Sequence, residues 1–153
     1  MYNISALFQN YCLISVAVAW ILAQIIKVFT GYFREESFDM RKFFCGTGGM
    51  PSAHSATVMA LVISSAWQYG FASYAFAIAV LFATIVMSDA TGVRLETGKQ
   101  AKIINQIITE LFTGKGDVQT NLKELIGHTP FQVAVGAILG IIVAVVLKLT
   151  VYR

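Results

Sequence analysis

The chain has 153 residues, of which 57% are hydrophobic and only 12% are charged. A mean hydropathy of +0.70 is too high for a water-soluble domain and is typical of a small polytopic membrane protein. The net charge of +3 excludes little by itself, but the chain lacks the aromatic-basic stripe that single-stranded nucleic acids require, so we expect no nucleic-acid binding. No tandem repeat is visible, and we expect a single membrane domain over residues 1–153.

Four apolar runs approach the length of about 20 residues that crosses a hydrocarbon core of about 30 Å. They cover residues 4–29, 55–69, 72–90 and 131–151. The second run is the shortest and contains several Ser and Ala residues, so we expect the other spans to bury it. The first run has no basic segment before it and no cleavage site after it, which favours a retained span over a signal peptide. The two cysteines differ in depth, because Cys12 is in the first span and Cys45 in the following loop, so we expect no disulfide.

A glycine-rich segment, 46–50, leads from the first large loop into the second span. Pro51 suits the first turn of the helix that follows, and Ser52 or Ser55 can cap it. The free N–H groups at this helix start form an anion site, and His54 lies beside them. The simpler alternative is that the glycines only form a sharp turn from loop to helix.

The third span follows a tight turn near Gly70 and ends at Asp89. A carboxylate at membrane depth is costly, so it is usually paired or functional. Arg94 is close enough in sequence to pair with Asp89, and a purely structural pair remains an alternative to a role in a site.

The second large loop, 91–129, is long enough to contain structure of its own. Residues 101–112 have apolar side chains at spacings of three and four, which predicts an amphipathic helix lying in the membrane interface. Asn121 and Glu124 match a capping box that starts a short helix before His128. Thr129 and Pro130 then start the last span. Two histidines at two helix starts on one side of a membrane indicate a phosphoryl-transfer site.

Two spans separate the two large loops, so both loops face the same side. Most basic residues fall in these loops or in the approach to the first of them. They are Lys27, Arg34, Arg41, Lys42, Arg94, Lys99, Lys102, Lys115 and Lys123. The excess of Lys and Arg predicts that this side is cytoplasmic. We therefore expect a multi-pass protein of the inner (plasma) membrane with both termini outside and the histidines on the cytoplasmic side.

These motifs resemble those of the type-2 phosphatidic acid phosphatase superfamily, which also includes vanadium-dependent haloperoxidases, and most closely its divergent bacterial branch. Lys27 and Arg34 have the spacing of the first motif, although Glu35 replaces its proline. The second motif, Pro-Ser-Gly-His, is present as Pro-Ser-Ala-His at residues 51–54. The histidine of the third motif matches His128.

The third motif departs from the superfamily pattern elsewhere. Asn121 and Leu122 stand at its serine and arginine positions, with Lys123 displaced by one from the arginine position. Gln132 stands at its aspartate position. The segment 89–94, which contains Asp, Gly and Arg, has no counterpart in the ordinary motif.

The resemblance implies an all-α membrane bundle of about four transmembrane helices plus the interfacial helix, acting as a phosphatase on lipid phosphates or diphosphates. It implies that His128 attacks phosphorus to form a phosphohistidine, while His54 acts as general acid and then as base. Asp89 or Glu124 is then a candidate to orient His128. Gln132 is a further candidate for the same role, although its side chain is uncharged. The candidate phosphate-binding residues are Lys27, Arg34, Ser52, Ala53, Arg94 and Lys123. No metal or other cofactor is expected.

The substrate implied is a membrane lipid phosphate or polyprenyl diphosphate that reaches the site from the bilayer. A second hypothesis keeps the phosphate cradle without the chemistry, so that the protein binds or moves a phosphorylated lipid. A third is a structural membrane subunit without a ligand. Gly136 and Gly140 form a small-residue face, which fits a homodimer contact as well as packing within one subunit.

Overall fold

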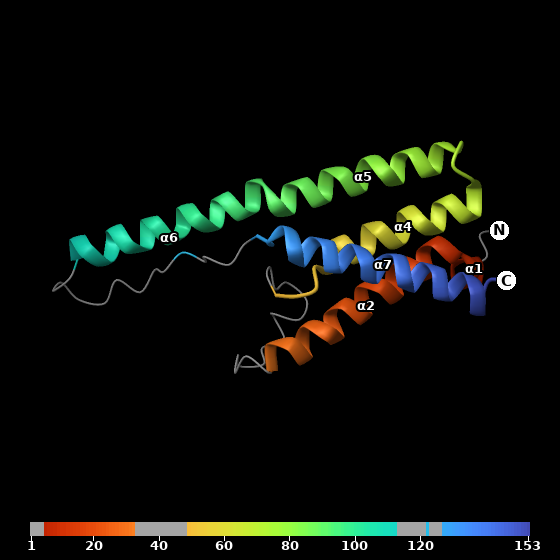
Figure 1. Ribbon diagram of the computed structural model, residues 1–153, viewed down its shortest axis with the longest axis horizontal. Coiled ribbons are helices and arrows are strands. Elements are labelled where there is room, and N and C mark those ends of the chain that lie inside the picture. The colour runs from red at the N-terminus through yellow and green to blue at the C-terminus, as the bar shows by residue number, and fades with distance from the viewer. Residues whose placement is uncertain (1–4, 33–48, 113–121, 123–126) are drawn as a thin grey trace.

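In the computed structural model, which describes residues 5–32, 49–112, 122 and 127–153, all regular elements are α-helices (Figure 1). They are α1 (Ser5–Gln9), α2 (Tyr11–Tyr32), α4 (Ala53–Tyr69), α5 (Tyr74–Thr91), α6 (Val93–Phe112) and α7 (Pro130–Thr150). Three described segments are long and apolar enough to cross a membrane, namely Tyr11–Thr30, Tyr74–Leu111 and Pro130–Thr150. The expected all-α membrane fold is confirmed.

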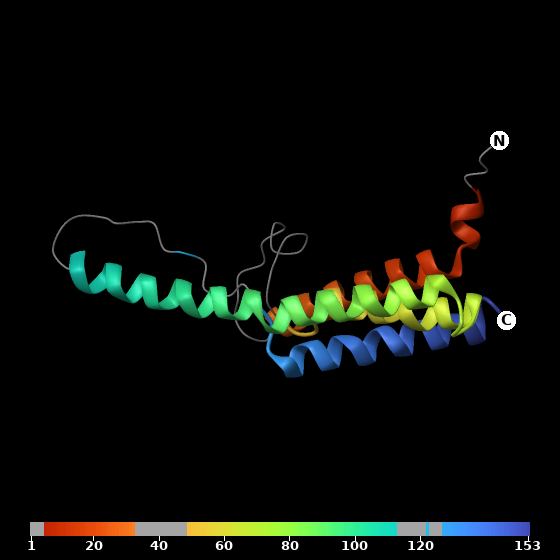
Figure 2. The ribbon, with the colours of Figure 1, turned by 90° about the horizontal axis from the view of Figure 1, so that it is seen from above.

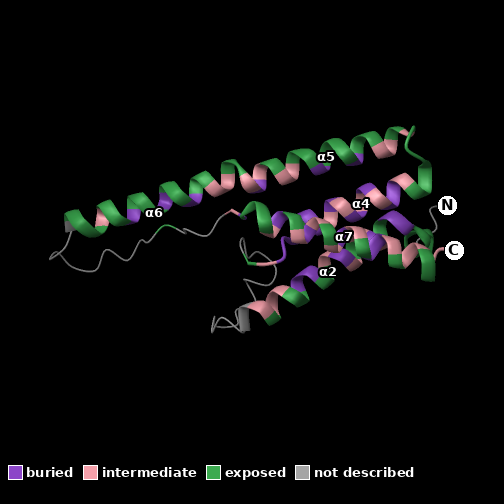
Figure 3. Cartoon of the chain, viewed as in Figure 1, coloured by how far each residue is buried: buried purple, intermediate pink, exposed green. Residues whose placement is uncertain are grey.

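Helix α4 lies at the centre of the bundle and packs against α2, α5 and α7. Its small side chains form much of the core, and Figure 3 shows buried residues concentrated on α2, α4 and α7. Ala56 and Ala60 are fully buried against α2 and α7 residues such as Ala19, Ala23 and Ala144. The predicted burial of the second span is confirmed, because small side chains let three neighbours approach it closely.

The contact between α4 and α7 depends on two glycines of α7. A Cβ atom on Gly136 would overlap the carbonyl oxygen of Ser52, and one on Gly140 would overlap the carbonyl oxygen of Ala56. Only a residue without a side chain fits at either position. The small-residue face of α7 therefore packs within the subunit.

Helices α5 and α6 lie along the outside of the bundle, and α6 extends beyond the other helices (Figures 1 and 2). Gly70 ends α4 with a positive φ of 83°, and Ser73 caps α5, as expected for a tight turn. The predicted amphipathic helix is present, but it begins at Val93 and runs on almost in line with α5. The Gly92 N–H still donates to the Ser88 carbonyl (2.8 Å), which keeps the two helices nearly continuous.

Two local boundaries differ from the sequence expectation. The first apolar run is divided at Asn10, whose side-chain oxygen accepts from the Leu13 N–H (3.0 Å) and so starts a new helix. The short α1 therefore turns away from α2 (Figure 2). Pro51 was expected in the first helical turn but precedes it, because the extended Ser52 is the N-cap and accepts from the Ser55 N–H.

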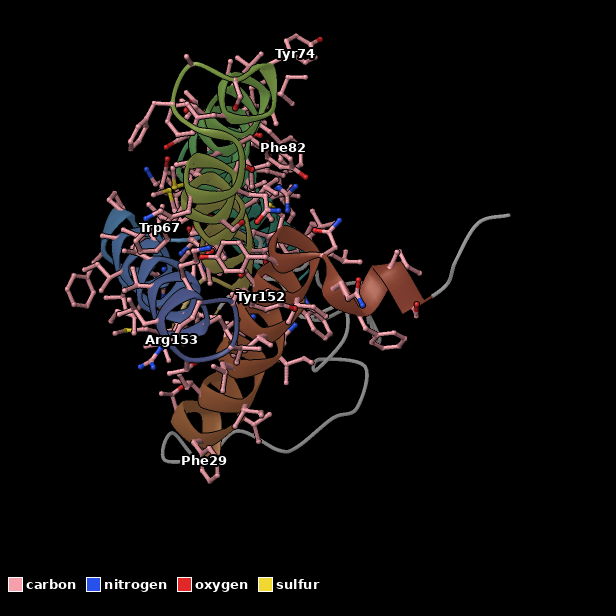
Figure 4. The ribbon with its side chains drawn as sticks, turned by 90° about the vertical axis from the view of Figure 1, so that its right-hand side faces the viewer. Phe29, Trp67, Tyr74, Phe82, Tyr152 and Arg153 are labelled. Carbon is pink, nitrogen blue, oxygen red and sulfur yellow. The ribbon has the colours of Figure 1, made fainter. Side chains whose placement is uncertain are left out.

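Helix α1 and the C-terminal end of α7 lie at the same end of the bundle (Figure 1). The Tyr152 hydroxyl donates to the Phe8 carbonyl (3.2 Å), and the buried Tyr11 hydroxyl donates to the Ala144 carbonyl (2.7 Å). Seen from this end, Tyr74 and Phe82 point outward from α5, where lipid would surround them (Figure 4). The starts of α4 and α7 lie at the opposite end.

The α4–α7 contact predicts that Gly140→Ala destabilises the protein by about 1–3 kcal/mol, the usual cost of overpacking. The added methyl group would collide with backbone atoms of Ala56 and Ala60, which no rotamer change can move. Thermal unfolding in detergent measures the effect. Ala134→Val, which enlarges an exposed position of the same helix, is the control. Equal midpoints for the two variants would contradict this packing.

Candidate functional site

The backbones at the starts of α4 and α7 are hydrogen-bonded to each other. The Ser52 N–H donates to the Gln132 carbonyl oxygen at 3.2 Å, one turn before the Gly136 contact. Both histidines belong to these starts. His54 is the second residue of α4 and is exposed, whereas His128 lies just before Pro130 and is only 5% exposed. The structure therefore brings the two motif histidines to one end of the bundle.

The backbone of His128 is held by the junction of α5 and α6. Its N–H donates to the Ala90 carbonyl at 3.1 Å. Gly127 lies against the start of α6, where a Cβ atom would come within 2.5 Å of the Leu95 backbone. The ring itself faces α7, with Nδ1 3.3 Å from Oε1 of Gln132. Contacts with α5, α6 and α7 therefore fix the position of His128.

Lys27 brings positive charge to the histidines from α2. Its aliphatic stem lies close to Gly49, whose positive φ of 81° and missing side chain leave room for it. The Thr30 hydroxyl donates to the Met50 carbonyl (2.8 Å) and ties the end of α2 to this turn. Lys27 lies within electrostatic range of both His54 and His128.

Asp89 and Arg94 form an ion pair across the junction of α5 and α6, with Nε and Oδ2 2.5 Å apart. Both side chains are more than one-third exposed, so the pair contributes at most about 1 kcal/mol to stability. Arg94 also lies within electrostatic range of both histidines, and Asp89 within that of His54. The Asp89–Arg94 ion pair is present, as expected if its role is purely structural. However, it lies close to the histidines, which also allows a role in the site.

The start of α4 presents two backbone donors. Ser52 itself is fully buried, its N–H is used by Gln132 and its hydroxyl accepts from the Ser55 N–H (3.4 Å). Within the part of the chain that the structure describes, the N–H groups of Ala53 and His54 have no hydrogen-bond partner. They lie at the positive end of a helix, where an anion is stabilised.

Three of the predicted site residues, Arg34, Lys123 and Glu124, lie outside the described residues. One feature that the sequence analysis did not identify is the capping box of α7. The Thr129 hydroxyl accepts from the Gln132 N–H (3.4 Å), and Gln132 Oε1 accepts from the Thr129 N–H (3.0 Å). The Thr-x-x-Gln spacing before an apolar run was the signal that indicates it.

No cluster of three His, Cys, Asp or Glu side chains suited to a metal ion occurs among residues 5–32, 49–112, 122 and 127–153. The described residues at this end of the bundle include two imidazoles, Lys27, the Asp89–Arg94 pair and the free amides of α4. Such a set can bind an anion and exchange protons with it.

Comparison with known proteins gives a family and a relative for this chain. The model of a family described as the divergent PAP2 family matches residues 8–143. A Bacillus subtilis (strain 168) protein named "Uncharacterized membrane protein YuiD" is 39% identical over 152 residues, which cover 92% of this chain and 96% of that protein. No solved structure matches this chain.

Burial lowers the pKa of His128 below its ordinary 6.5; the contact with Gln132 opposes this, and the charges of Lys27, His54 and Arg94 add to it. A neutral ring in the folded protein means that the unfolded chain binds more protons below pH 6.5. The free energy of unfolding should therefore fall as the pH drops below that value.

We expect a ¹⁵N NMR titration of the histidine-labelled protein to give His128 a midpoint below 6.5. The chain contains only two histidines, so His54→Asn assigns the remaining signal. A His128 midpoint at or above 6.5 would contradict the burial and the positive surroundings described here.

Proposed function

Because this chain belongs to the divergent PAP2 family, we propose that it is a membrane-embedded phosphatase that acts on lipid phosphates or lipid diphosphates. The observation that carries the proposal is the backbone contact between the starts of α4 and α7, which holds His54 and His128 together beside Lys27 and Arg94. Two imidazoles among cations are what metal-independent phosphoryl transfer through a phosphohistidine requires.

His128 is the proposed nucleophile. A nucleophilic imidazole must be neutral, and burial among positive groups favours the neutral ring. His54 is the proposed general acid for the leaving oxygen and then the base that takes a proton from water. Its exposed position suits a group that must contact both the leaving lipid and water.

Phosphate binding is assigned to groups from three helices: Lys27 of α2, Arg94 of α6 and the free N–H groups of Ala53 and His54 in α4. These donors offset the charge on the phosphoryl oxygens, which is the main source of catalysis in phosphoryl transfer. The N–H of Ser52 already donates to the Gln132 carbonyl, so Ser52 contributes by capping α4 and not by binding phosphate through its N–H. Arg34 and Lys123 remain proposed phosphate ligands from the sequence pattern alone.

The proposed substrate enters from the bilayer, because the histidines lie at one end of a bundle whose outer surface is apolar. The proposal has this end on the cytoplasmic side of the plasma membrane, with both termini outside, and the excess of Lys and Arg in the sequences of the two large loops supports it. Polyprenyl diphosphates, phosphatidic acid and phosphatidylglycerophosphate all meet these requirements. A homodimer remains part of the proposal, with a contact other than the Gly136–Gly140 face.

A second candidate function is binding or transport of a phosphorylated lipid without hydrolysis. The observation that favours it is Gln132, an uncharged residue that contacts His128 where the superfamily pattern has aspartate. Binding would need Lys27 and Arg94 but neither imidazole, which separates the two functions experimentally.

The proposal predicts phosphate release by the purified protein from a panel of lipid phosphates and diphosphates. His54→Ala and His128→Ala should each lower the rate by at least about 100-fold, because each removes a group that forms or breaks a bond. Lys102→Ala, an exposed change on α6, is the control and should be fully active. Lipid binding by all of these proteins without release by any would support the second function instead.

Asp89→Asn tests whether the ion pair serves the site. We expect turnover to fall by about tenfold or more because Arg94 loses the partner that holds it beside the histidines. The unfolding midpoint should change little, since both partners are partly exposed. Equal relative losses of turnover and of folded protein would show that the pair is only structural.

A further inference from the structure

The side-chain oxygen of Gln132 identifies which nitrogen of His128 carries a proton. Oε1 accepts from the Thr129 N–H at 3.0 Å, so the atom at that position must be the amide oxygen and not the amide nitrogen. The same oxygen lies 3.3 Å from Nδ1 of His128. An amide oxygen can only accept, so the hydrogen at this contact must come from Nδ1.

Gln132 cannot easily turn away from this contact. Its N–H donates to the Thr129 hydroxyl at 3.4 Å, and its carbonyl accepts from the Ser52 N–H at 3.2 Å. The backbone of Gln132 is therefore held by both helix starts, while its side chain is held by the capping box. The His128 N–H donates to the Ala90 carbonyl, so the backbone of His128 is fixed as well. The His128 ring and the Gln132 amide therefore face each other from two fixed backbone positions.

Within the described ranges of the chain, the charged groups that act electrostatically on His128 are positive: Lys27 of α2, His54 of α4 and Arg94 of α6. Asp89, the acidic group at the end of α5, is paired with Arg94. Among the described residues, the one side chain in contact with the His128 ring nitrogens is the uncharged Gln132. In the part of the chain that the structure describes, no carboxylate is hydrogen-bonded to this ring.

We propose that Gln132 is a positioning residue that holds His128 as the Nδ1–H tautomer, leaves Nε2 as the nucleophile, and keeps the site active at lower pH than a carboxylate would. This inference rests on the proposed phosphatase function. A carboxylate at the same place would favour the protonated ring, which cannot attack. The uncharged amide supplies the same orientation and favours the protonated ring less than a carboxylate would.

The proton balance follows from the tautomer. The lone pair of Nε2 forms a bond to phosphorus as the bond from phosphorus to the leaving oxygen breaks, and that oxygen takes the proton of His54. The Nδ1 proton stays between His128 and Gln132, so the phosphorylated ring carries one positive charge. Water then attacks phosphorus, gives a proton to His54, and the electrons of the N–P bond return to Nε2.

Gln132→Glu keeps the oxygen that completes the cap but adds a charge, so it should raise the pKa of His128. We expect the acid limb of the kcat profile to move upward by about one pH unit, with activity retained above it. Gln132→Met removes the acceptor and should lower kcat by roughly 100-fold at every pH, with little change in KM, because the ring is no longer held in the reactive tautomer.

Thr129→Val is the matched control for capping. It removes the hydroxyl that Gln132 uses but leaves the Thr129 N–H and the Gln132 contact with His128. If Gln132→Met acts only by weakening the start of α7, Thr129→Val will reproduce its kinetics, and the proposal is overturned. Full activity in Thr129→Val beside a slow Gln132→Met supports it.

The tautomer of His128 can be determined without measuring enzymatic turnover. In ¹⁵N spectra at neutral pH we expect Nδ1 of His128 to be protonated and Nε2 to carry the lone pair, with this preference lost in Gln132→Met. An Nε2–H tautomer in the unaltered protein overturns the positioning role whatever the activity. The Nδ1–H tautomer in a protein that hydrolyses no lipid phosphate would support the orientation while overturning the phosphatase function.

Discussion

The close backbone approach of α4 and α7 determines where every other part of the site can lie. Gly136 and Gly140 let α7 touch the carbonyl groups of Ser52 and Ala56, and the Ser52–Gln132 hydrogen bond then fixes the two helix starts at one level. With any larger residue at either glycine, the backbones of the two helices would have to move apart. A membrane gives little hydrophobic drive to helix association, so such close contacts contribute much of the packing energy.

The α4–α7 contact also explains how a small chain without a large core can bring charged side chains together at one end of the bundle. Lys27 arrives beside Gly49 from α2, Arg94 is held by Asp89 at the junction of α5 and α6, and His128 is bonded to Ala90. Each group is placed by backbone geometry or by a short polar contact. Cations gathered in this way would repel one another in the absence of an anion, which fits a site whose ligand is a phosphate.

Sequence patterns predicted the helices, their polar turns and the convergence of His54, His128, Asp89 and Arg94 at one end. Amphipathic spacing and caps act locally, so they can be read from neighbouring residues. Gln132 was named as an uncharged candidate to orient His128, but its role in the capping box of α7 was not predicted. The break at Asn10 was also missed, since one asparagine in an apolar run gives a weak signal. The close approach of Gly127 to Leu95 at the start of α6 is a tertiary contact, which no local pattern reports.

The most direct measurement is to trap the covalent intermediate during turnover. A lipid phosphate labelled with ³²P at its terminal phosphoryl group is mixed with the protein, quenched in alkaline denaturant and mapped by peptide sequencing. The proposed phosphohistidine mechanism requires an acid-labile, base-stable label on His128 that is absent from His128→Ala. Phosphate release with the label on another residue, or with no label at all, would contradict it.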